Sequence, residues 1–501
     1  MVIRIIGRVF YPSATGAVAG VLLLGSAVGC MTVASADAPP PKAPPEYKVN
    51  VNKPDGLSGY VFYTTGLGGV NDNGKQPTDG GGATAEPKKE KGAGSVARIM
   101  TKSGQVVYQR AAPKGERINN FRTQTYRGKP VLTWWQGESQ SGHGVGTDFI
   151  ADDHYNIIAS FTPSNMPADA HEFRLTPDGK ALVTSYVEKT VDLTSVGGPK
   201  HGKIYDCIAS VIDVATKRTL FQWDALQHVP VADTYASFKA EKILDPYHMN
   251  SIALDPSGNL VISLRHTSTI YNINRTTGAI NWRLGGKHST FALGKGIQFS
   301  YQHDAEMPNA TTVSMFNNND GPQVQGTPAQ RRLSSLEWIH LDLAARKATL
   351  IRNQTHPDDL RAAATGNMQA LPNGNAFGSW GNAGHISEFT PDGQMLYDAV
   401  PARRTYRAYF DPWRGSPTTP PQLVLPAQGK TDARAIWNGA TNVAQWRVLH
   451  GPTTTDLTPL TTVAWRGYDT TIPLKDEPSG YYQLQALDAH GHVLVQTAPV
   501  H

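Results

Sequence analysis

Cysteine, net charge and long regular apolar runs are all scarce in this sequence. The 501 residues include 2 cysteines, and the formal net charge is only +5. No basic cluster with interleaved aromatic residues is present, which argues against a nucleic-acid partner. Heptad repeats and long amphipathic helical patterns are also missing, so coiled coils and helical bundles are excluded. With 48 glycines and 35 prolines, short alternating segments between turn dipeptides dominate, and this pattern is typical of an all-β protein.

One extended apolar run does occur, at the N-terminus. Arg4 and Arg8 precede AVAGVLLLGSAVG, and the small residues ASA at 34–36 follow it. This order predicts a secretory signal peptide at 1–36, because the run is too short to span a membrane. A lipoprotein anchor at Cys30 is the second interpretation. Both predict export to the periplasm, the cell envelope or the medium, and cleavage would leave Cys207 without a partner for an intrachain disulfide.

An imperfect repeat organises most of the remaining chain. Units that begin with a polar residue and continue as strand, turn and strand start at His171, His248, His303 and Asn367, which are 77, 55 and 64 residues apart. Repeats of this size predict a β-propeller, whose inner strands line one central channel. An irregular β-sandwich is the alternative. In the propeller, the three histidines would converge at one mouth of the channel.

The domain boundaries follow from changes in composition. Residues 37–50 form a Pro-rich spacer, and residues 51–415 form the propeller, interrupted by a Gly-rich surface loop at 66–94. Residues 416–501 alternate without the repeat, which predicts a small immunoglobulin- or fibronectin-like β-sandwich without chemistry of its own.

The stretch YHMNSIALDPSGNLVISLRHTS at 247–268 combines a hairpin with a polar open end. DPSG is turn chemistry, and SIAL and LVIS are the predicted strands. Depending on whether the turn contains a bulge, His248 faces Arg265 or His266. Because cations do not pair with each other for stability, an anion is expected between them.

Other catalytic motifs are missing or incomplete. RLGGKHS lacks the first glycine of a phosphate loop, and neither G-x-S-x-G nor H-E-x-x-H occurs. A zinc site formed by His171, His248 and His303 remains an alternative, although Arg265 would repel the ion. We predict neither a metal nor another cofactor.

Several ordered motifs carry a resemblance to a known family. They are DAHEFRLTPDGKALVTSY, the hairpin stretch with its continuation TIYNINRTTGAINWRLGGKHSTF, YQHDAEM, NMQALPNGNAFGSWG and WNGATNVAQWRVL. From about Gly56 to the C-terminus the chain resembles the arylsulfotransferase (aryl-sulfate sulfotransferase) family. The resemblance implies a six-bladed propeller that moves a sulfuryl group from an aryl sulfate donor to a phenolic acceptor. It implies transfer through a histidine intermediate, without the nucleotide sulfate donor.

The same resemblance implies roles for individual residues. His303 is similar to the histidine that becomes sulfated, and His171 to a further active-site histidine. His248, Asn250 and Arg265 resemble the group that binds sulfate and stabilises charge. His266 is a further candidate for binding the substrate.

The chemistry of these residue types agrees with those roles. Sulfuryl transfer from a monoanionic ester should depend mainly on positioning and electrostatics, as phosphoryl transfer does. His303 must be neutral to attack, and a nearby Arg265 would lower its pKa. Arg265 can bind two sulfate oxygens, Asn250 can donate a third hydrogen bond, and either His171 or His248 can exchange the phenol proton.

Three alternatives remain at this point: a propeller that binds aryl sulfates without turnover, a three-histidine metal-dependent hydrolase, and a sulfatase that uses water as the acceptor. Some residues near the motifs have simpler interpretations. Strand alternation turns His266 away from the face of Arg265, and His143 in SGHGVG is expected in a surface loop. Tyr247 and Trp380 suit either aryl stacking or core packing.

Overall fold

The computed structural model describes residues 47–66, 94–140, 142–239, 242–323, 333–427, 430–474 and 479–501. The predicted signal peptide, the possible anchor at Cys30 and nearly all of the Gly-rich loop lie outside these residues. All described residues belong to one compact unit, Pro45–His501. No helix in the described part of the chain is long and apolar enough to cross a membrane.

Strands dominate the described residues, and this confirms the all-β class. Six sheets succeed one another along residues 47–411, and two more follow. The only α-helix in the described segments is the short α1 (Ala225–His228). Short 3-10 turns occupy Thr194–Val196, Val231–Asp233 and Gly381–Ala383.

The first three sheets are antiparallel and four-stranded. Sheet 1 contains, in spatial order, β26 (Ala408–Asp411), β2 (Tyr60–Thr64), β3 (Val96–Met100) and β4 (Val106–Ala111). Sheet 2 contains β5 (Arg117–Tyr126), β6 (Lys129–Gln140), β7 (His143–Ala151) and β8 (Ile157–Phe161). Sheet 3 contains β9 (Phe173–Leu175), β10 (Lys180–Val191), β11 (Gly202–Asp213) and β12 (Arg218–Asp224).

The next three sheets follow the same pattern, and sheets 5 and 6 each have one more strand at the outer edge. Sheet 4 contains β13 (Met249–Leu254), β14 (Leu260–Leu264), β15 (Thr269–Ile273) and β16 (Ile280–Gly285). Sheet 5 contains β18 (His303–Asn309), β19 (Thr312–Asn317), β20 (Ser335–Asp342), β21 (Lys347–Thr355) and β17 (Ala292–Leu293). Sheet 6 contains β22 (Gln369–Ala370), β23 (Ala376–Ser379), β24 (Ile386–Phe389), β25 (Met395–Pro401) and β1 (Tyr47–Asn52).

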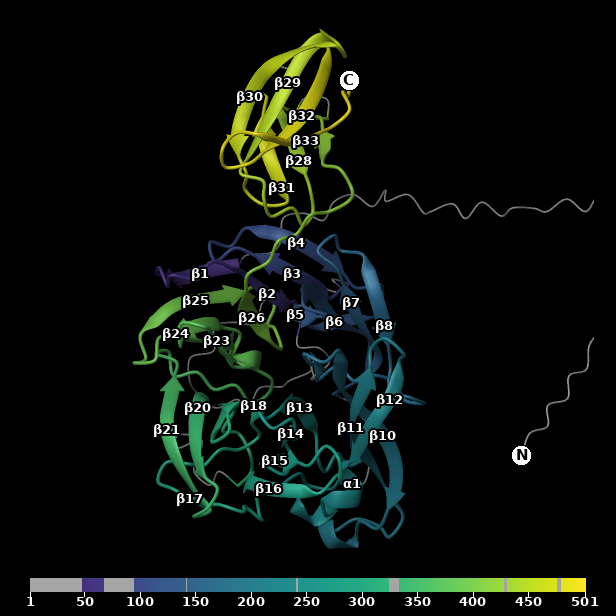
Figure 1. The fold of residues 1–501 in the computed structure, drawn as a ribbon, viewed down its shortest axis with the longest axis vertical. Coiled ribbons are helices and arrows are strands. Elements are labelled where there is room, and N and C mark those ends of the chain that lie inside the picture. Colours follow the sequence, from purple (N-terminus) through teal and green to yellow (C-terminus); the bar gives the residue numbers. More distant parts are fainter. Residues whose placement is uncertain are drawn as a thin grey trace, which may run out of the picture. The chain divides into compact units, whose positions relative to one another are not determined.

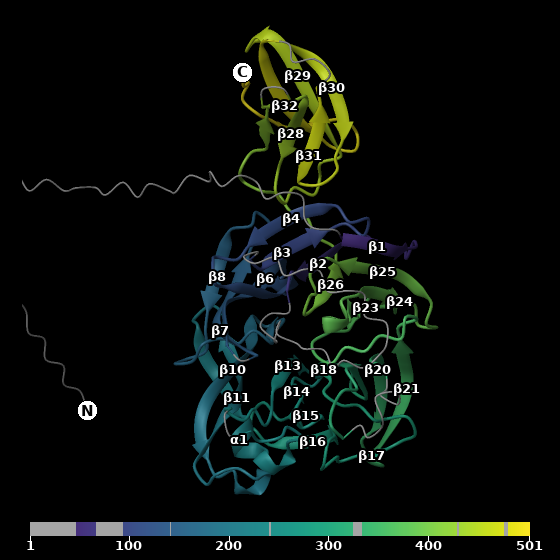
Figure 2. The ribbon, with the colours of Figure 1, turned by 180° about the vertical axis from the view of Figure 1, so that it is seen from behind.

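Hydrophobic cores join these sheets in sequence. Separate clusters of buried side chains lie between sheets 1 and 2, 2 and 3, 3 and 4, 4 and 5, and 5 and 6. A sixth cluster joins sheet 6 back to sheet 1, where Tyr397 of β25 and Phe410 of β26 share a core. Figures 1 and 2 show the six sheets around one centre from opposite sides. Each sheet therefore buries both faces against its neighbours, which explains why central strands such as β14, β15 and β19 are buried along their whole length.

Residues after 416 form two further antiparallel sheets with their own core around Trp446. One sheet consists of β27 (Gln422–Val424), β28 (Asp432–Ile436) and β31 (Asp469–Pro473). The other consists of β30 (Asp456–Ala464), β29 (Gln445–Thr453), β32 (Tyr481–Leu487) and β33 (Val493–Gln496).

Edge strands bring the predicted site residues towards the centre. β9, β13 and β18 are the edge strands of sheets 3, 4 and 5, and β13 contacts β18. His171 lies two residues before β9, His248 lies one residue before β13, and His303 begins β18. The repeat seen in the sequence therefore corresponds to the start of successive edge strands.

Candidate active site

The hairpin β13–β14 forms as the sequence predicts, but its two ends have different registers. Near the turn Leu254 pairs with Leu260, as expected when Gly258 takes a left-handed backbone (φ 81°) in a bulged turn. A second irregularity between Met249 and Ser251 shifts the register at the open end. There the Arg265 N–H donates to the His248 carbonyl over 3.0 Å. His248 is therefore the backbone partner of Arg265, while its ring lies 4.7 Å from that of His266.

The predicted orientation of His266 is wrong. β14 ends at Leu264, and residues 265–268 form a turn, so strand alternation does not apply to them. His266 Nδ1 lies 2.6 Å from the Asp245 carbonyl and must donate its hydrogen there. Its Nε2 is then the acceptor for Arg265 Nη1 at 2.8 Å. His266 consequently fixes the position of Nη1 of Arg265.

His303 is positioned by an amide whose orientation the structure determines. Asn318 Nδ2 donates to the carbonyls of Ala362 (2.7 Å) and Thr365 (2.9 Å), so its Oδ1 faces His303 Nδ1 at 2.6 Å. His303 Nδ1 therefore carries the hydrogen, and the lone pair is on Nε2. Burial, followed by the charge of Arg265, lowers the pKa of His303 well below its ordinary value. The ring is neutral at physiological pH and presents an unprotonated Nε2.

His171 belongs to a buried Asp–His pair. Its Nδ1 lies 2.7 Å from Asp169 Oδ2, which also accepts the His171 backbone N–H at 2.9 Å. Although burial opposes ionisation, the neighbouring His171 lowers the pKa of Asp169 to about 2, so Asp169 is a carboxylate. His171 Nε2 is buried and has no hydrogen-bond partner. That nitrogen is free to accept a proton, and Asp169 would stabilise the resulting imidazolium.

A second Asp–His pair holds His248. Its Nδ1 lies 2.5 Å from Asp245 Oδ2, and its backbone N–H donates to Asp245 Oδ1 at 2.9 Å. These bonds hold His248 in a left-handed backbone with φ 51°, a costly conformation for any residue with a Cβ. Burial, His171 and Arg265 together lower the pKa of His248 well below its ordinary value.

Arg265 differs from the nearby Arg122, Arg174 and Arg407 because no described carboxylate lies within ion-pair distance of it. Its Nη2 donates to the Ala363 carbonyl at 3.0 Å, its charge lies 4.0 Å from the ring centre of Tyr301, and its Nε is buried without a partner. A guanidinium with an unused N–H and no counterion is suited to binding an anion.

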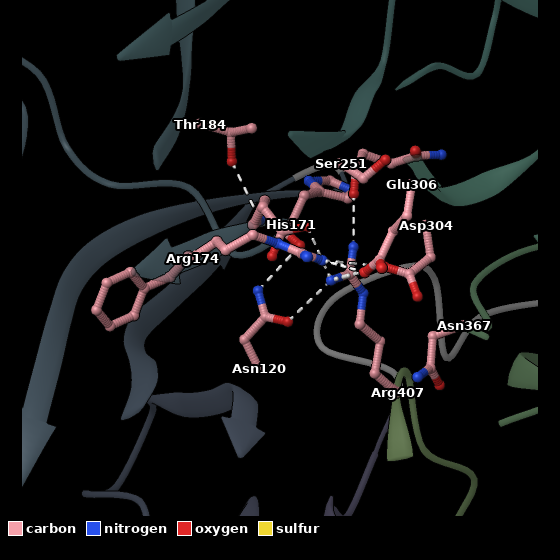
Figure 3. Close-up of polar contacts among 12 residues, drawn as sticks. Asn120, His171, Arg174, Thr184, Ser251, Asp304, Glu306, Asn367 and Arg407 are labelled. Atoms are coloured by element: carbon pink, nitrogen blue, oxygen red, sulfur yellow. Dashed lines mark hydrogen bonds and ion pairs between the residues drawn. The ribbon is translucent and has the colours of Figure 1, made fainter. Parts of the chain in front are cut away.

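Other charges nearby balance one another. Figure 3 shows Arg407, Arg174 and Asp304 meeting beside His171. Three arginines and three acids form this charge network: Arg122, Arg174, Arg407, Glu172, Asp304 and Glu306. Glu172 and Asp304 are both engaged by arginines of this network. The network is neutral overall, so Arg265 is the cation beside the histidines that is not part of an ion pair with a described carboxylate.

The imidazole rings of the site lie close to one another and to the ring of Tyr406. The centroids of His171 and His248 are 4.9 Å apart, and Tyr406 lies between His171 (5.8 Å) and His303 (6.0 Å). The hydroxyl of Tyr406 is buried and has no hydrogen-bond partner. The structure thus brings His171, His248, His303, Arg265 and His266 together, with two free imidazole nitrogens and a free hydroxyl among them.

Asn250 is present at the site, although its amide is already occupied. Its Nδ2 donates to the Gln302 carbonyl at 2.7 Å, and its Oδ1 is buried without a partner. This bond fixes the chain immediately before His303. Its predicted hydrogen bond to sulfate stays a prediction, and it would have to use the second N–H of the amide.

Sequence reasoning missed several contributors to the site. Asp169 and Asp245 were visible as acids two and three residues before their histidines, whereas Asn318 and Tyr406 reach the site from distant segments. His143 was wrongly expected in a surface loop: it is 5 % exposed, and its ring stacks on Tyr186 at 4.1 Å. β7 begins at His143 and carries it inward.

Tyr247 and Trp380 belong to the hydrophobic cores. Tyr247 is fully buried and donates its hydroxyl hydrogen to the Val229 carbonyl at 2.7 Å. Trp380 is 1 % exposed and packs between sheets 5 and 6. Neither side chain offers a face for an aryl ring.

Two side-chain clusters in the described segments could approach one metal ion, and neither is the set of His171, His248 and His303 that the sequence offered as an alternative. They are His143 with Asp245 and His248, and His356 with Asp358 and His385. In the first cluster the 2.5 Å between Asp245 Oδ2 and His248 Nδ1 is a hydrogen-bond distance. It is too short for two ligands of a tetrahedral ion that is bonded to each at about 2.0 Å.

Comparison with known families decides the affiliation. Residues 122–402, more than half of the chain, match the family described as Arylsulfotransferase (ASST). The chain belongs to the arylsulfotransferase family. The matched segment contains all six predicted site residues, whereas Tyr406 and Arg407 lie just beyond it. A search of curated proteins found no match.

Solved structures give weaker similarities. A protein of unknown function from Bacteroides caccae is 12 % identical with a TM-score of 0.37, over 68 % of this chain and 93 % of that chain. A putative 6-phosphogluconolactonase from Bacteroides fragilis is 10 % identical with a TM-score of 0.35, over 72 % of this chain and 99 % of that chain. A catalytically inactive virginiamycin B lyase from Staphylococcus aureus, solved with quinupristin, is 9 % identical with a TM-score of 0.29, over 73 % of this chain and 96 % of that chain. At these values the similarities carry no argument about the candidate site.

Proposed function

We propose that this arylsulfotransferase family member moves a sulfuryl group from an aryl sulfate to a phenol through a sulfated His303. Family membership supports sulfuryl transfer in general. The observation that carries the specific proposal is the neutral His303, whose pKa is lowered by burial and by the unpaired Arg265. This supports a site in which His303 acts as the nucleophile and Arg265 binds the anion.

The first half-reaction uses the free nitrogen of His303. Its Nε2 forms a bond to sulfur while the bond from sulfur to the aryl oxygen breaks, and the electron pair leaves on that oxygen. Arg265 binds the sulfuryl oxygens, and Asn318 Oδ1 accepts the Nδ1 hydrogen as the ring gains positive charge. Protonated His171 gives its Nε2 proton to the departing phenolate.

The second half-reaction reverses these steps with another phenol. His171 Nε2 removes the hydroxyl proton of the acceptor, whose oxygen attacks sulfur and releases neutral His303. The carboxylate of Asp169 stabilises the imidazolium that His171 forms before the first half-reaction and again after the second. His171 is favoured over His248 for this role because its Nε2 is the buried nitrogen without a partner.

The architecture that accompanies this function is a six-bladed propeller, residues 51–415, followed by a β-sandwich at 416–501. Six sheets joined by six successive cores support the blade count. We also propose export by the signal at 1–36. An exported enzyme would suit a reaction that needs only an ester donor and a covalent histidine.

An intact-mass measurement tests the function. The protein is mixed briefly with an aryl sulfate in the absence of acceptor, and we expect a gain of one sulfuryl group that added phenol removes. His303→Ala should show no gain, whereas the matched control His340→Ala, at an exposed position on β20, should behave as the wild type.

The same measurement separates the alternatives. Release of phenol without an adduct would refute the covalent proposal, and its inhibition by a chelator would favour a metal-dependent hydrolase. Binding without turnover would favour a non-catalytic propeller. An adduct that water discharges as fast as phenol would make the protein a sulfatase.

A further inference from the structure

Arg407 is a buried arginine at the centre of the charge network. It is 3 % exposed and lies immediately before β26, outside the segment that matches the family. Its Nη1 lies 3.1 Å from Glu172 Oε2 and 3.4 Å from Asp304 Oδ1, and its Nη2 donates to the Asn250 carbonyl at 2.8 Å. One guanidinium therefore contacts three segments from three different sheets.

Each contacted residue is a near neighbour of a predicted site histidine. Glu172 follows His171, Asp304 follows His303, and Asn250 lies two residues after His248. Figure 3 shows Arg407 reaching from its strand towards Asp304, with His171 on the other side of the network. The two acids bind Arg407, whereas the rings of His171 and His303 bind Asp169 and Asn318 instead.

The contacted segments have backbones that need external support. Asp304 has a left-handed backbone with φ 52°, and His248 has one with φ 51°. Such conformations persist in residues other than glycine only where surrounding contacts hold them. Arg407 contacts Asp304 directly and the segment of His248 through the Asn250 carbonyl.

Arg407 is less available to a substrate anion than Arg265, although its Nε is also buried without a partner. Both of its Nη atoms are engaged by protein acceptors, which also include Asn120 Oδ1 at 3.3 Å. Its charge is compensated by Glu172 and Asp304, in contrast to that of Arg265. Its contribution must therefore be made through the segments that it holds.

We propose that Arg407 is the positioning residue that holds the segments of His171, His248 and His303 in register for sulfuryl transfer. This inference rests on the proposed function. Lysine at this position keeps the charge, but its single ammonium group cannot contact Glu172, Asp304 and the Asn250 carbonyl with the planar fork of a guanidinium.

The test compares Arg407→Lys with a matched variant, Arg122→Lys. Arg122 is also buried and also binds Glu172, at 2.9 Å, but besides Tyr409 it contacts only the segment of His171, through Glu172 and Phe173. Because misplacement of reacting groups by about 1 Å costs roughly 100-fold in rate, we expect Arg407→Lys to slow formation of the His303 adduct by about that factor. KM for the donor should change little, since Arg265 is untouched. Arg122→Lys should lose less than about tenfold.

A spectroscopic readout makes the test independent of turnover. The imidazole nitrogen resonances of His171, His248 and His303 should all shift in Arg407→Lys, whereas only those of His171 should shift in Arg122→Lys. If Arg407→Lys does not fold, Asp304→Asn is the second variant. It weakens the contact between Arg407 and Asp304, and it should shift the resonances of His303 alone.

Several outcomes would overturn the proposal. Equal rate losses in the two arginine variants, or resonance shifts confined to one histidine in Arg407→Lys, would reduce Arg407 to a general stabilising residue. Absence of the adduct in the wild type would refute the proposed function, and the resonances would still decide whether Arg407 holds the three segments.

Discussion

At the scale of single residues, hydrogen bonds decide which nitrogen each histidine presents. Asn318 takes the Nδ1 hydrogen of His303, Asp169 takes that of His171, and the Asp245 carbonyl takes that of His266. The partner also sets the chemistry: a neutral amide keeps His303 a nucleophile, whereas a carboxylate prepares His171 to carry a proton. Chemically identical side chains thus acquire different roles from one neighbouring atom.

Replacing Tyr406 with phenylalanine should separate catalysis from stability. The Tyr406 hydroxyl is buried without a partner, so its removal should leave the free energy of unfolding unchanged or slightly higher. If the hydroxyl donates to the reacting oxygens, its loss should lower kcat by roughly 100-fold, as for other oxyanion donors. Steady-state kinetics and urea unfolding measure the two effects. An unchanged kcat would show that the hydroxyl does not touch the substrate.

At the scale of elements, irregularities in strands create the site. The shift of register between Met249 and Ser251 places Arg265 beside His248, and the turn after β14 brings His266 to the same side. A regular hairpin would have carried these side chains to alternate faces. Of the two predicted partners of His248, Arg265 is the one that occurs, because the bulged register at the turn is shifted back before the open end.

Asp398 on β25 joins several elements of sheet 6, and its loss should destabilise that sheet. Its Oδ1 lies 3.3 Å from His356 Nε2 and 3.0 Å from His385 Nδ1, and its Oδ2 accepts from Asn50 on β1 at 2.7 Å. In Asp398→Asn an amide N–H would face one of these donors, which should cost about 1 to 3 kcal/mol of unfolding free energy. Asp358→Asn, at an exposed position, is the control.

Asp398→Asn should also change how the free energy of unfolding depends on pH. Burial raises the pKa of Asp398, but hydrogen bonds from His356, His385 and Asn50 outweigh it and hold the pKa well below the usual range. A depressed carboxyl pKa adds stability above the unfolded value of about 3.9, and that stability is lost as the pH falls. Urea unfolding at pH 7 and pH 3 should show a larger acid loss in the wild type than in Asp398→Asn. Parallel losses would contradict the assignment.

At the scale of the whole molecule, the first and last sheets of the proposed propeller share strands from opposite ends of the segment. β26 pairs with β2, and β1 pairs with β25, so residues about 350 positions apart lie side by side. The chain after 416 adds contacts to sheets 1 and 2: Asn438 Oδ1 accepts from the Gln109 N–H at 2.8 Å, and the Gly439 carbonyl accepts from the Tyr155 hydroxyl at 2.6 Å.

Deletion of residues 416–501 should lower stability without removing any described site residue. The cores around Trp413 and Val106 would lose partners, including Tyr468, so Tm should fall. Because no side chain from 416–501 contacts the site histidines among the described residues, kcat at a temperature where the truncated chain is folded should stay close to that of the full chain. A large loss of kcat with a retained fold would give the C-terminal sheets a role in catalysis.

The amino-acid sequence by itself determined the all-β class, the hairpin, the order of the repeats and the family, because turn residues, alternation and motif spacing are local properties of the chain. It also identified His171, His248, His303, Arg265 and His266 as residues that would meet. Only the tertiary structure decided the partners Asn318, Tyr406 and Arg407, since these lie far away in sequence and their contacts depend on how separate sheets pack. The inward position of His143 and the turn that redirects His266 were decided in the same way, because pairing between strands determines where each strand begins and ends.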